Sequence, residues 1–169
     1  MKIAVISDIH DHLPNLKRVF RRIEKLGLQE VIVCGDIGSC CALEEFTAVN
    51  MNFHMVFGNN DGDQFKMLNL ANSVENIHIY EDVGELTFNG VRIAFVHKPI
   101  FARALASTGN YDVVFFGHTH RVKQERVGDT LLVNPGNVDV AGKPAGLAIY
   151  DTQSGKVELE EILCECQCE

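Results

Sequence analysis

The chain has 169 residues, 46% of them apolar and 22% charged, a composition typical of one globular domain that excludes a disordered chain. Fifteen basic against 23 acidic residues leave a net charge of −8, so we do not expect stable binding to nucleic acid, which needs many contacts from Lys and Arg to phosphates. No apolar run approaches the ~18 residues of a membrane span, and the first residues read as a strand rather than a signal peptide, so we expect a cytoplasmic protein without a membrane partner.

The first half of the chain alternates between predicted strands and helices. A short, wholly apolar run predicts a buried strand at 3–6, and mostly apolar runs predict two more at 31–34 and 53–57. Apolar residues at helical spacing predict helices between them, at 14–26 and 42–50. This strand-helix-strand-helix-strand order favours a parallel sheet covered by helices.

The second half is richer in predicted strands. The expected elements are strands at 77–80, 84–88 and 91–96, a helix at 99–109 and a strand at 112–116. Four more strands, resembling a meander, are expected at 121–127, 130–133, 147–151 and 156–162. Two packed sheets with helices outside would fit this pattern.

Side chains that can bind metal recur where the predicted strands end. They are Asp8, His10, Asp36, Asn59, His97, His118 and His120. Because the carboxyl ends of parallel strands form the binding crevice of α/β sheets, we expect these seven at one rim. Two carboxylates, four imidazoles and one amide oxygen suit borderline divalent ions, and the set lacks the cysteines typical of a closed structural zinc site.

Seven ligands are more than one catalytic ion uses. The set therefore predicts two divalent ions that share a bridging carboxylate, at the ~3.5–4 Å spacing of two-metal hydrolases. Asp36 is the natural bridge, because it follows the strand expected between the two groups. We expect Mn²⁺, with Ni, Fe, Co or Zn as alternatives, because these donors accept all of them.

Three other histidines have a structural interpretation. His54 and His78 lie inside predicted strands and are interpreted as satisfied core residues. His12 either approaches the cleft or lies at the start of the first helix.

The ordered motifs resemble those of the calcineurin-like metallophosphoesterases. They are Asp8-Ile9-His10, Gly35-Asp36, Gly58-Asn59-Asn60-Asp61, His97, Gly117-His118-Thr119-His120 and the turn Asn134-Pro135-Gly136. The resemblance covers residues 1 to about 162, and the small size without a cap domain is most similar to the YfcE-type phosphodiesterases of bacteria and archaea. It implies an α/β fold (α+β in some schemes), the four-layer α/β/β/α sandwich of metallo-dependent phosphatases.

The resemblance also implies how the ligands divide. Asp8, His10, Asp36 and His120 would hold the first ion, and Asp36, Asn59, His97 and His118 the second. The implied reaction is hydrolysis of a small phosphoester, a diester before a monoester, by a hydroxide that bridges the two ions. The alternative is a metal-binding scaffold with little or no catalysis, and a nuclease is disfavoured by the net charge and the lack of a basic groove.

Two positions depart from the family pattern. Many members carry His directly after the ligand Asn, where it protonates the leaving oxygen, whereas this chain has Asn60. An amide is not a general acid, so Asn60 is predicted to contact a phosphate oxygen at most, and activated aryl diesters should react better than unactivated monoesters. Lys98, after His97, is either a phosphate clamp or an exposed charge before a helix.

We expect one domain over residues 1–163, followed by a Cys-rich tail at 164–169. The alternating thiols of this tail would bind a soft metal, form a disulfide between chains, or stay reduced at a frayed end. Cys34 is expected in the core, and Cys40 and Cys41 near the cleft without a catalytic role. The oligomeric state stays open between a monomer and a homodimer.

Overall fold

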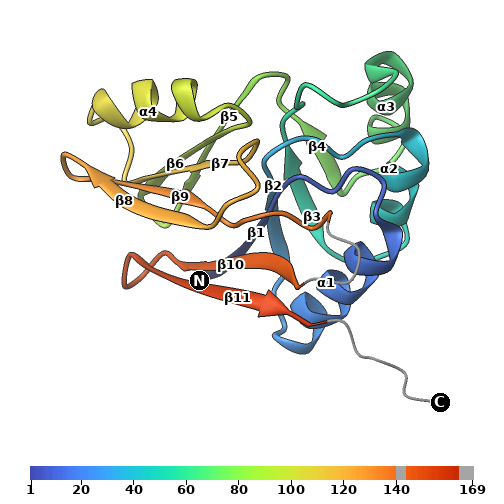
Figure 1. Ribbon diagram of the computed structural model, residues 1–169, viewed down its shortest axis with the longest axis horizontal. Helices are drawn as coiled ribbons and strands as arrows, with labels where there is room; N and C mark the ends of the chain where they lie inside the picture. Colours follow the sequence, from blue (N-terminus) through green and yellow to red (C-terminus); the bar gives the residue numbers. More distant parts are fainter. Residues whose placement is uncertain (140–143, 164–169) are drawn as a thin grey trace.

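The computed structural model describes residues 1–139 and 144–163, which fold into two β-sheets and four helices (Figure 1). The first sheet contains β1 (Lys2–Ile6), β2 (Glu30–Val33), β3 (Asn52–Met55), β4 (Ile77–Ile79), β10 (Ala145–Asp151) and β11 (Lys156–Ile162), in the order β11-β10-β1-β2-β3-β4. The second contains β5 (Val83–Phe88), β6 (Val91–Val96), β7 (Val113–Phe116), β8 (Lys123–Val127) and β9 (Thr130–Asn134), in the order β5-β6-β7-β9-β8. The helices are α1 (Leu13–Lys25), α2 (Cys40–Thr47), α3 (Gln64–Ala71) and α4 (Pro99–Ser107).

Four layers result from the alternation of side chains along the central strands. Ala4 and Ile6 of β1 belong to the apolar cluster that includes α1, α2 and α3, whereas Ile3 and Val5 belong to the cluster between the two sheets. Val114 of β7 faces the other way and joins the cluster of α4. Figure 1 shows α1, α2 and α3 grouped beside the first sheet and α4 over the second. The predicted α/β/β/α sandwich is therefore confirmed.

Parallel pairing brings the carboxyl ends of the central strands to a common rim. β1 to β4 are parallel neighbours in the first sheet, and β6, β7 and β9 are parallel in the second. Backbone hydrogen bonds join the loops that follow these strands: Asp8 N–H donates to the Gly35 carbonyl at 3.1 Å and Gly117 N–H to the His97 carbonyl at 3.0 Å. The loops that carry the predicted ligands are thus fixed to one another.

The meander predicted for the last four strands is wrong. β8 and β9 form a hairpin in the second sheet, whereas β10 and β11 form a hairpin in the first. Both β9 and β10 are buried, but they lie in different sheets. β9 pairs with β7, whereas β10 pairs with β1. The same turn residues suit a four-strand meander and two hairpins in separate sheets. The sequence pattern therefore did not distinguish these two arrangements.

One helix, α3, was missing from the predicted elements. Only Met67 and Ala71 of this helix are buried, so its apolar stripe is too narrow to stand out in the sequence. Asp63 caps the helix, since its side chain accepts a hydrogen bond from Lys66 N–H at 3.1 Å. An N-cap Asp is the signal that could have revealed α3.

The three additional histidines have different surroundings. His54 is a satisfied core residue, as predicted: its Nε2–H donates to Glu30 at 3.0 Å and its Nδ1 accepts from the Tyr80 hydroxyl at 3.0 Å. The prediction for His78 is wrong, because this side chain is exposed and stacks on His54 with the ring centres 5.4 Å apart. His12 lies at the N-cap of α1, where its Nδ1 accepts from Asn15 N–H at 3.2 Å.

We predict that His54 makes the protein less stable in mild acid. Burial lowers the pKa of His54 below the usual 6.5 and the His78 charge adds to this, although the Glu30 carboxylate opposes both effects. In mild acid the unfolded chain therefore binds more protons than the folded protein. The contribution of neutral His54 to the free energy of unfolding is complete above about pH 6.5 and falls as the pH drops toward the folded-state pKa. Denaturant unfolding of metal-free protein from pH 7 to pH 5 should show a smaller loss in His54→Gln than in the wild type. Parallel curves for the two proteins would contradict this.

Three of the six cysteines, Cys34, Cys40 and Cys41, lie in the part of the chain that the structure describes. Cys34 is buried, as predicted, whereas Cys40 is half-buried and Cys41 exposed, and all three are free thiols. The predicted tail at 164–169 lies outside the described residues. Within the described part of the chain, no helix has both the length and the apolar character that crossing a bilayer requires.

Candidate metal centre

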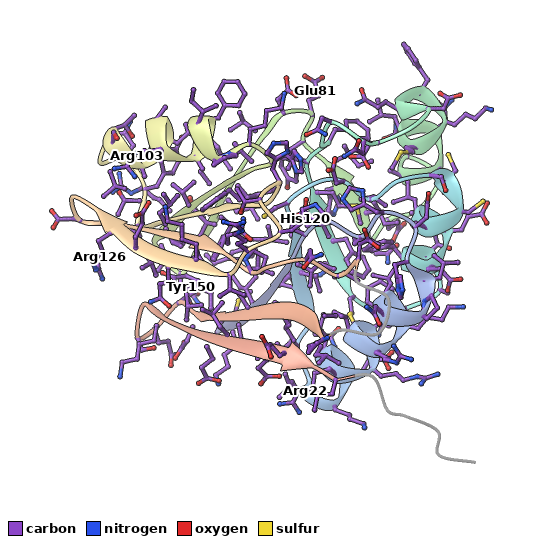
Figure 2. All side chains as sticks on the ribbon, in the orientation of Figure 1. Arg22, Glu81, Arg103, His120, Arg126 and Tyr150 are labelled. Carbon is purple, nitrogen blue, oxygen red and sulfur yellow. The ribbon has the colours of Figure 1, made fainter. Side chains whose placement is uncertain are left out.

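The seven predicted ligands lie on loops that follow β1, β2, β3, β6 and β7. Figure 2 labels His120, which lies near the centre of the molecule in this view, between the two sheets. The six His and Asp side chains form two groups of three, and the ligand atoms within each group lie within 4.8 Å of one another. Asn59 joins the second group through His97.

The first group consists of Asp8, His10 and His120. The Nε2 atoms of the two imidazoles are 3.2 Å apart, and His120 Nε2 lies 3.5 Å from Asp8 Oδ1. Asp8 is fully buried, whereas His120 is exposed, so the group reaches from the interior to the surface. The first group is therefore open to solvent on the side of His120.

The second group consists of Asp36, His97 and His118. His97 Nε2 lies 3.2 Å from His118 Nδ1, 3.1 Å from Asn59 Oδ1 and 3.3 Å from Asp36 Oδ2. His97 Nδ1 is 2.8 Å from the Cys34 carbonyl, which only accepts, so Nδ1 carries a proton and Nε2 faces the group. Burial lowers the pKa of His97, but the hydrogen bonds to Asp36 and Cys34 and the charges of Asp36 and Asp8 raise it above 6.5 overall. Nε2 then donates to Asp36 and must lose its proton to bind a cation.

One carboxylate lies between the two groups. Asp36 Oδ2 is 3.3 Å from His97 Nε2 in the second group and 3.6 Å from His10 Nε2 in the first. Asp36 is 1% exposed, so its charge acts inside the protein rather than in solvent. The carboxylate thus lies near a nitrogen atom of each group, and its bridging role stays a prediction.

The backbone at these ligands is unusual. Five of them have positive φ angles: Asp8 (54°), His10 (45°), Asp36 (53°), His118 (69°) and His120 (55°). Residues other than glycine rarely adopt this left-handed conformation, and it concentrates at functional sites where the surrounding structure enforces it. Its occurrence at five ligand residues supports a functional site on these loops.

A family model described as the calcineurin-like phosphoesterase superfamily domain matches residues 1–155. The chain belongs to this superfamily. It is 34% identical to phosphodiesterase MJ0936 of Methanocaldococcus jannaschii, over 98% of this chain and all of that protein. It is 29% identical to phosphodiesterase YfcE of Escherichia coli strain K12, over 89% of this chain and 88% of that protein. The solved structure of an archaeal phosphodiesterase superposes with a TM-score of 0.86 at 32% identity, covering 96% of this chain and all of that one.

The donor set of this superfamily member fits divalent cations. In the second group the Asn59 and Asp36 oxygens, both hydrogen-bond acceptors, lie 3.1 and 3.3 Å from His97 Nε2. Once Nε2 has lost its proton, three acceptors face the same space, and a cation there offsets their repulsion. Superfamily phosphoesterases use divalent metals, and these two groups are the candidate sites in the described residues.

The two carboxylates experience opposite environments. Burial raises the pKa of Asp8, and the Ser7 hydroxyl, the His97 and His120 charges and the His118 N–H offset only part of this rise. Burial would also raise the pKa of Asp36, but the hydrogen bonds from His97 and Asn60 outweigh burial and lower it below its ordinary value. Asp36 is therefore ready as a charged bridge, whereas Asp8 gains most from a neighbouring cation.

The side chains that hold the ligand loops together were not predicted from the sequence. Asp61 accepts from Gly38 N–H at 2.8 Å and from Gly58 N–H at 2.6 Å, which joins the loops after β2 and β3. Asn137 Nδ2 lies 3.2 Å from His120 Nδ1 and orients that ring. Asp61 ends the motif that begins at Gly58 and could have been identified as a turn residue. The sequence around Asn137 gives no comparable indication of its contact with His120.

Asn60 has a defined place beside the bridge. Its backbone N–H donates to Asp36 Oδ1 at 2.8 Å, and its side-chain Nδ2 donates to Asp36 Oδ2 at 2.9 Å. Asn60 therefore orients Asp36, a role that the sequence did not suggest, and the predicted contact with a phosphate oxygen stays a prediction. The turn at Asn134 has a structural role, because Asn134 Nδ2 donates to the Gly117 carbonyl at 2.8 Å.

Proposed function

We propose that this chain is a metal-dependent phosphodiesterase that uses two divalent ions. The observation that carries the proposal is the position of Asp36 Oδ2 between two groups of ligand atoms, 3.3 Å from one and 3.6 Å from the other. The names of the relatives support a diester substrate, since both MJ0936 and YfcE are phosphodiesterases and each aligns over most of this chain.

The described residues divide naturally between two ions. Asp8, His10, Asp36 and His120 would hold the first, and Asp36, Asn59, His97 and His118 the second. When bound, such ions neutralise charge on the phosphate and lower the pKa of a water to about 7. We propose Mn²⁺ as the preferred ion, with Ni, Fe, Co or Zn as alternatives, because imidazole and carboxylate donors suit all of them.

The chain's own residues orient this centre rather than attack the substrate. Cys34 holds the His97 ring in one tautomer, and Asn60 fixes both oxygens of Asp36. The exposed position of His120 leaves access for a small phosphoester. The Asn60 amide is too weak an acid to protonate a leaving oxygen, so the reaction depends on the stability of the leaving group itself.

The proposal predicts a preference for activated diesters. Protein loaded with Mn²⁺ should hydrolyse bis(4-nitrophenyl) phosphate with a kcat/KM about 10²-fold or more above that for glycerol phosphate, because general acid catalysis of the poor leaving group is missing. Release of 4-nitrophenolate and of inorganic phosphate measures the two reactions. A preference for the alkyl monoester would contradict the diester assignment, and metal binding without any turnover would favour the scaffold alternative.

Other expectations of the sequence stay predictions. They are the single domain over residues 1–163, the cytoplasmic location, the absence of stable nucleic-acid binding, and the choice between a monomer and a homodimer.

A further inference from the structure

A pocket of about 300 Å³ adjoins the second ligand group. Two of its lining residues, Asn59 and His97, belong to that group. The others that matter here are Phe57, Asp82, Lys98 and Phe101. Ligand pockets range from about 300 to 1,000 Å³, so this one fits a single small group rather than a polymer.

Three separate segments build the pocket walls. Phe57 comes from the loop after β3, Asp82 from the connection between β4 and β5, and Lys98 and Phe101 from the start of α4. Phe57 is 7% exposed and forms a fixed apolar wall, whereas Phe101 is 55% exposed and has most of a ring available for stacking. An aromatic ring half open to solvent beside a candidate active site suits a flat partner.

The two charged residues of the pocket are not used elsewhere. Over residues 1–139 and 144–163, neither Asp82 nor Lys98 makes a side-chain hydrogen bond or an ion pair. Lys98 also occupies the N-cap of α4 without a side-chain cap bond, so its charge adds to the positive end of that helix. The pocket therefore offers a cation, a carboxylate that accepts hydrogen bonds, and an aromatic face.

We propose that this pocket binds the nucleoside part of the substrate, so that the substrate is a diester of a nucleoside phosphate. This inference rests on the proposed function, because it places the phosphate at the second ligand group. The base stacks on Phe101, a ring N–H or amino group of the base donates to Asp82, and Lys98 faces the anionic phosphate. An alkyl group in place of the nucleoside gains neither the stacking nor the hydrogen bond.

The test compares two diesters that release the same 4-nitrophenolate. They are thymidine 5′-(4-nitrophenyl) phosphate and methyl 4-nitrophenyl phosphate, assayed with protein loaded with Mn²⁺. Phe101→Ala should lower kcat/KM about tenfold for the thymidine ester, the size typical of one base stacked on an aromatic ring, and leave the methyl ester within twofold. Ile100→Ala is the matched control, because Ile100 is the neighbouring exposed residue of α4 at 72% exposure and does not line the pocket.

A binding measurement separates this inference from the proposed function. Thymidine 5′-monophosphate titrated into the Mn²⁺-loaded protein should bind about tenfold more weakly to Phe101→Ala than to the wild type. If neither ester is hydrolysed but this difference in binding is found, the nucleoside pocket stands and the proposed function fails. Absence of both turnover and binding would overturn both.

Two outcomes would overturn the pocket alone. The first is hydrolysis of both esters at equal kcat/KM, unchanged in Phe101→Ala, which would leave the phosphodiesterase assignment intact. The second is an equal loss for both esters together with a change in sedimentation, which would assign Phe101 to a contact between two copies of the chain.

Discussion

Replacement of Asp36 by Asn is expected to lower kcat/KM for bis(4-nitrophenyl) phosphate by at least about 10³-fold. The bridging charge would be lost from both ligand groups at once, and each ion contributes several kcal/mol of charge stabilisation in the transition state. Asn keeps the shape of the side chain and tolerates the left-handed backbone at this position, where φ is 53°. Metal content by mass spectrometry should fall for both ions.

Single-group variants provide the contrast for Asp36→Asn. His120→Ala removes a ligand of the first group and His97→Ala one of the second, so each should lose one ion in preference to the other. Asp129→Asn removes the same charge from the exposed turn between β8 and β9 and should retain activity and both ions. Equal loss of both ions from every ligand variant would contradict the division of the site.

The addition of a single methyl group at Gly58, in Gly58→Ala, should also impair the metal centre. A Cβ at this position would overlap the Asp36 carboxylate and its backbone nitrogen, so the bridge would have to move. The φ angle of Gly58 lies outside the left-handed region, so the effect of Gly58→Ala is steric rather than conformational. We expect a loss of about 1–3 kcal/mol in the free energy of unfolding and a 10–100-fold loss in Mn²⁺ affinity.

Gly62→Ala is the control for this variant. Gly62 lies in the same loop, and the nearest atom to its added Cβ would be the Gly38 carbonyl oxygen at 3.3 Å. Denaturant unfolding of metal-free protein and titration with Mn²⁺ measure both quantities. The steric account fails if Gly58→Ala matches the wild type, or if Gly62→Ala is damaged to the same extent.

The sequence was sufficient to predict which loops meet, because polar residues directly follow buried parallel strands. Asp8 and Asp36 follow two such neighbours, and the parallel order alone places them together. The strands of the C-terminal half were less predictable, since their partners lie far along the chain and the turn residues between them fit several pairings. The side chains that fix the loops were hardest to predict: Asp61 and Asn137 act through contacts across loops, which leave no periodic pattern.

The left-handed backbone at the ligand residues affects how the site can be engineered. At Asp8, His10 or His118, replacement by alanine removes the ligand but keeps an unfavourable φ, whereas glycine removes the ligand and relaxes the backbone as well. The relaxation is on the order of 1 kcal/mol per position. Some glycine variants should therefore have a higher free energy of unfolding than the parent protein when no metal ions are present. At these few positions a substitution would then raise thermal stability and lower turnover together. A screen for thermostable variants would therefore select against catalytic activity.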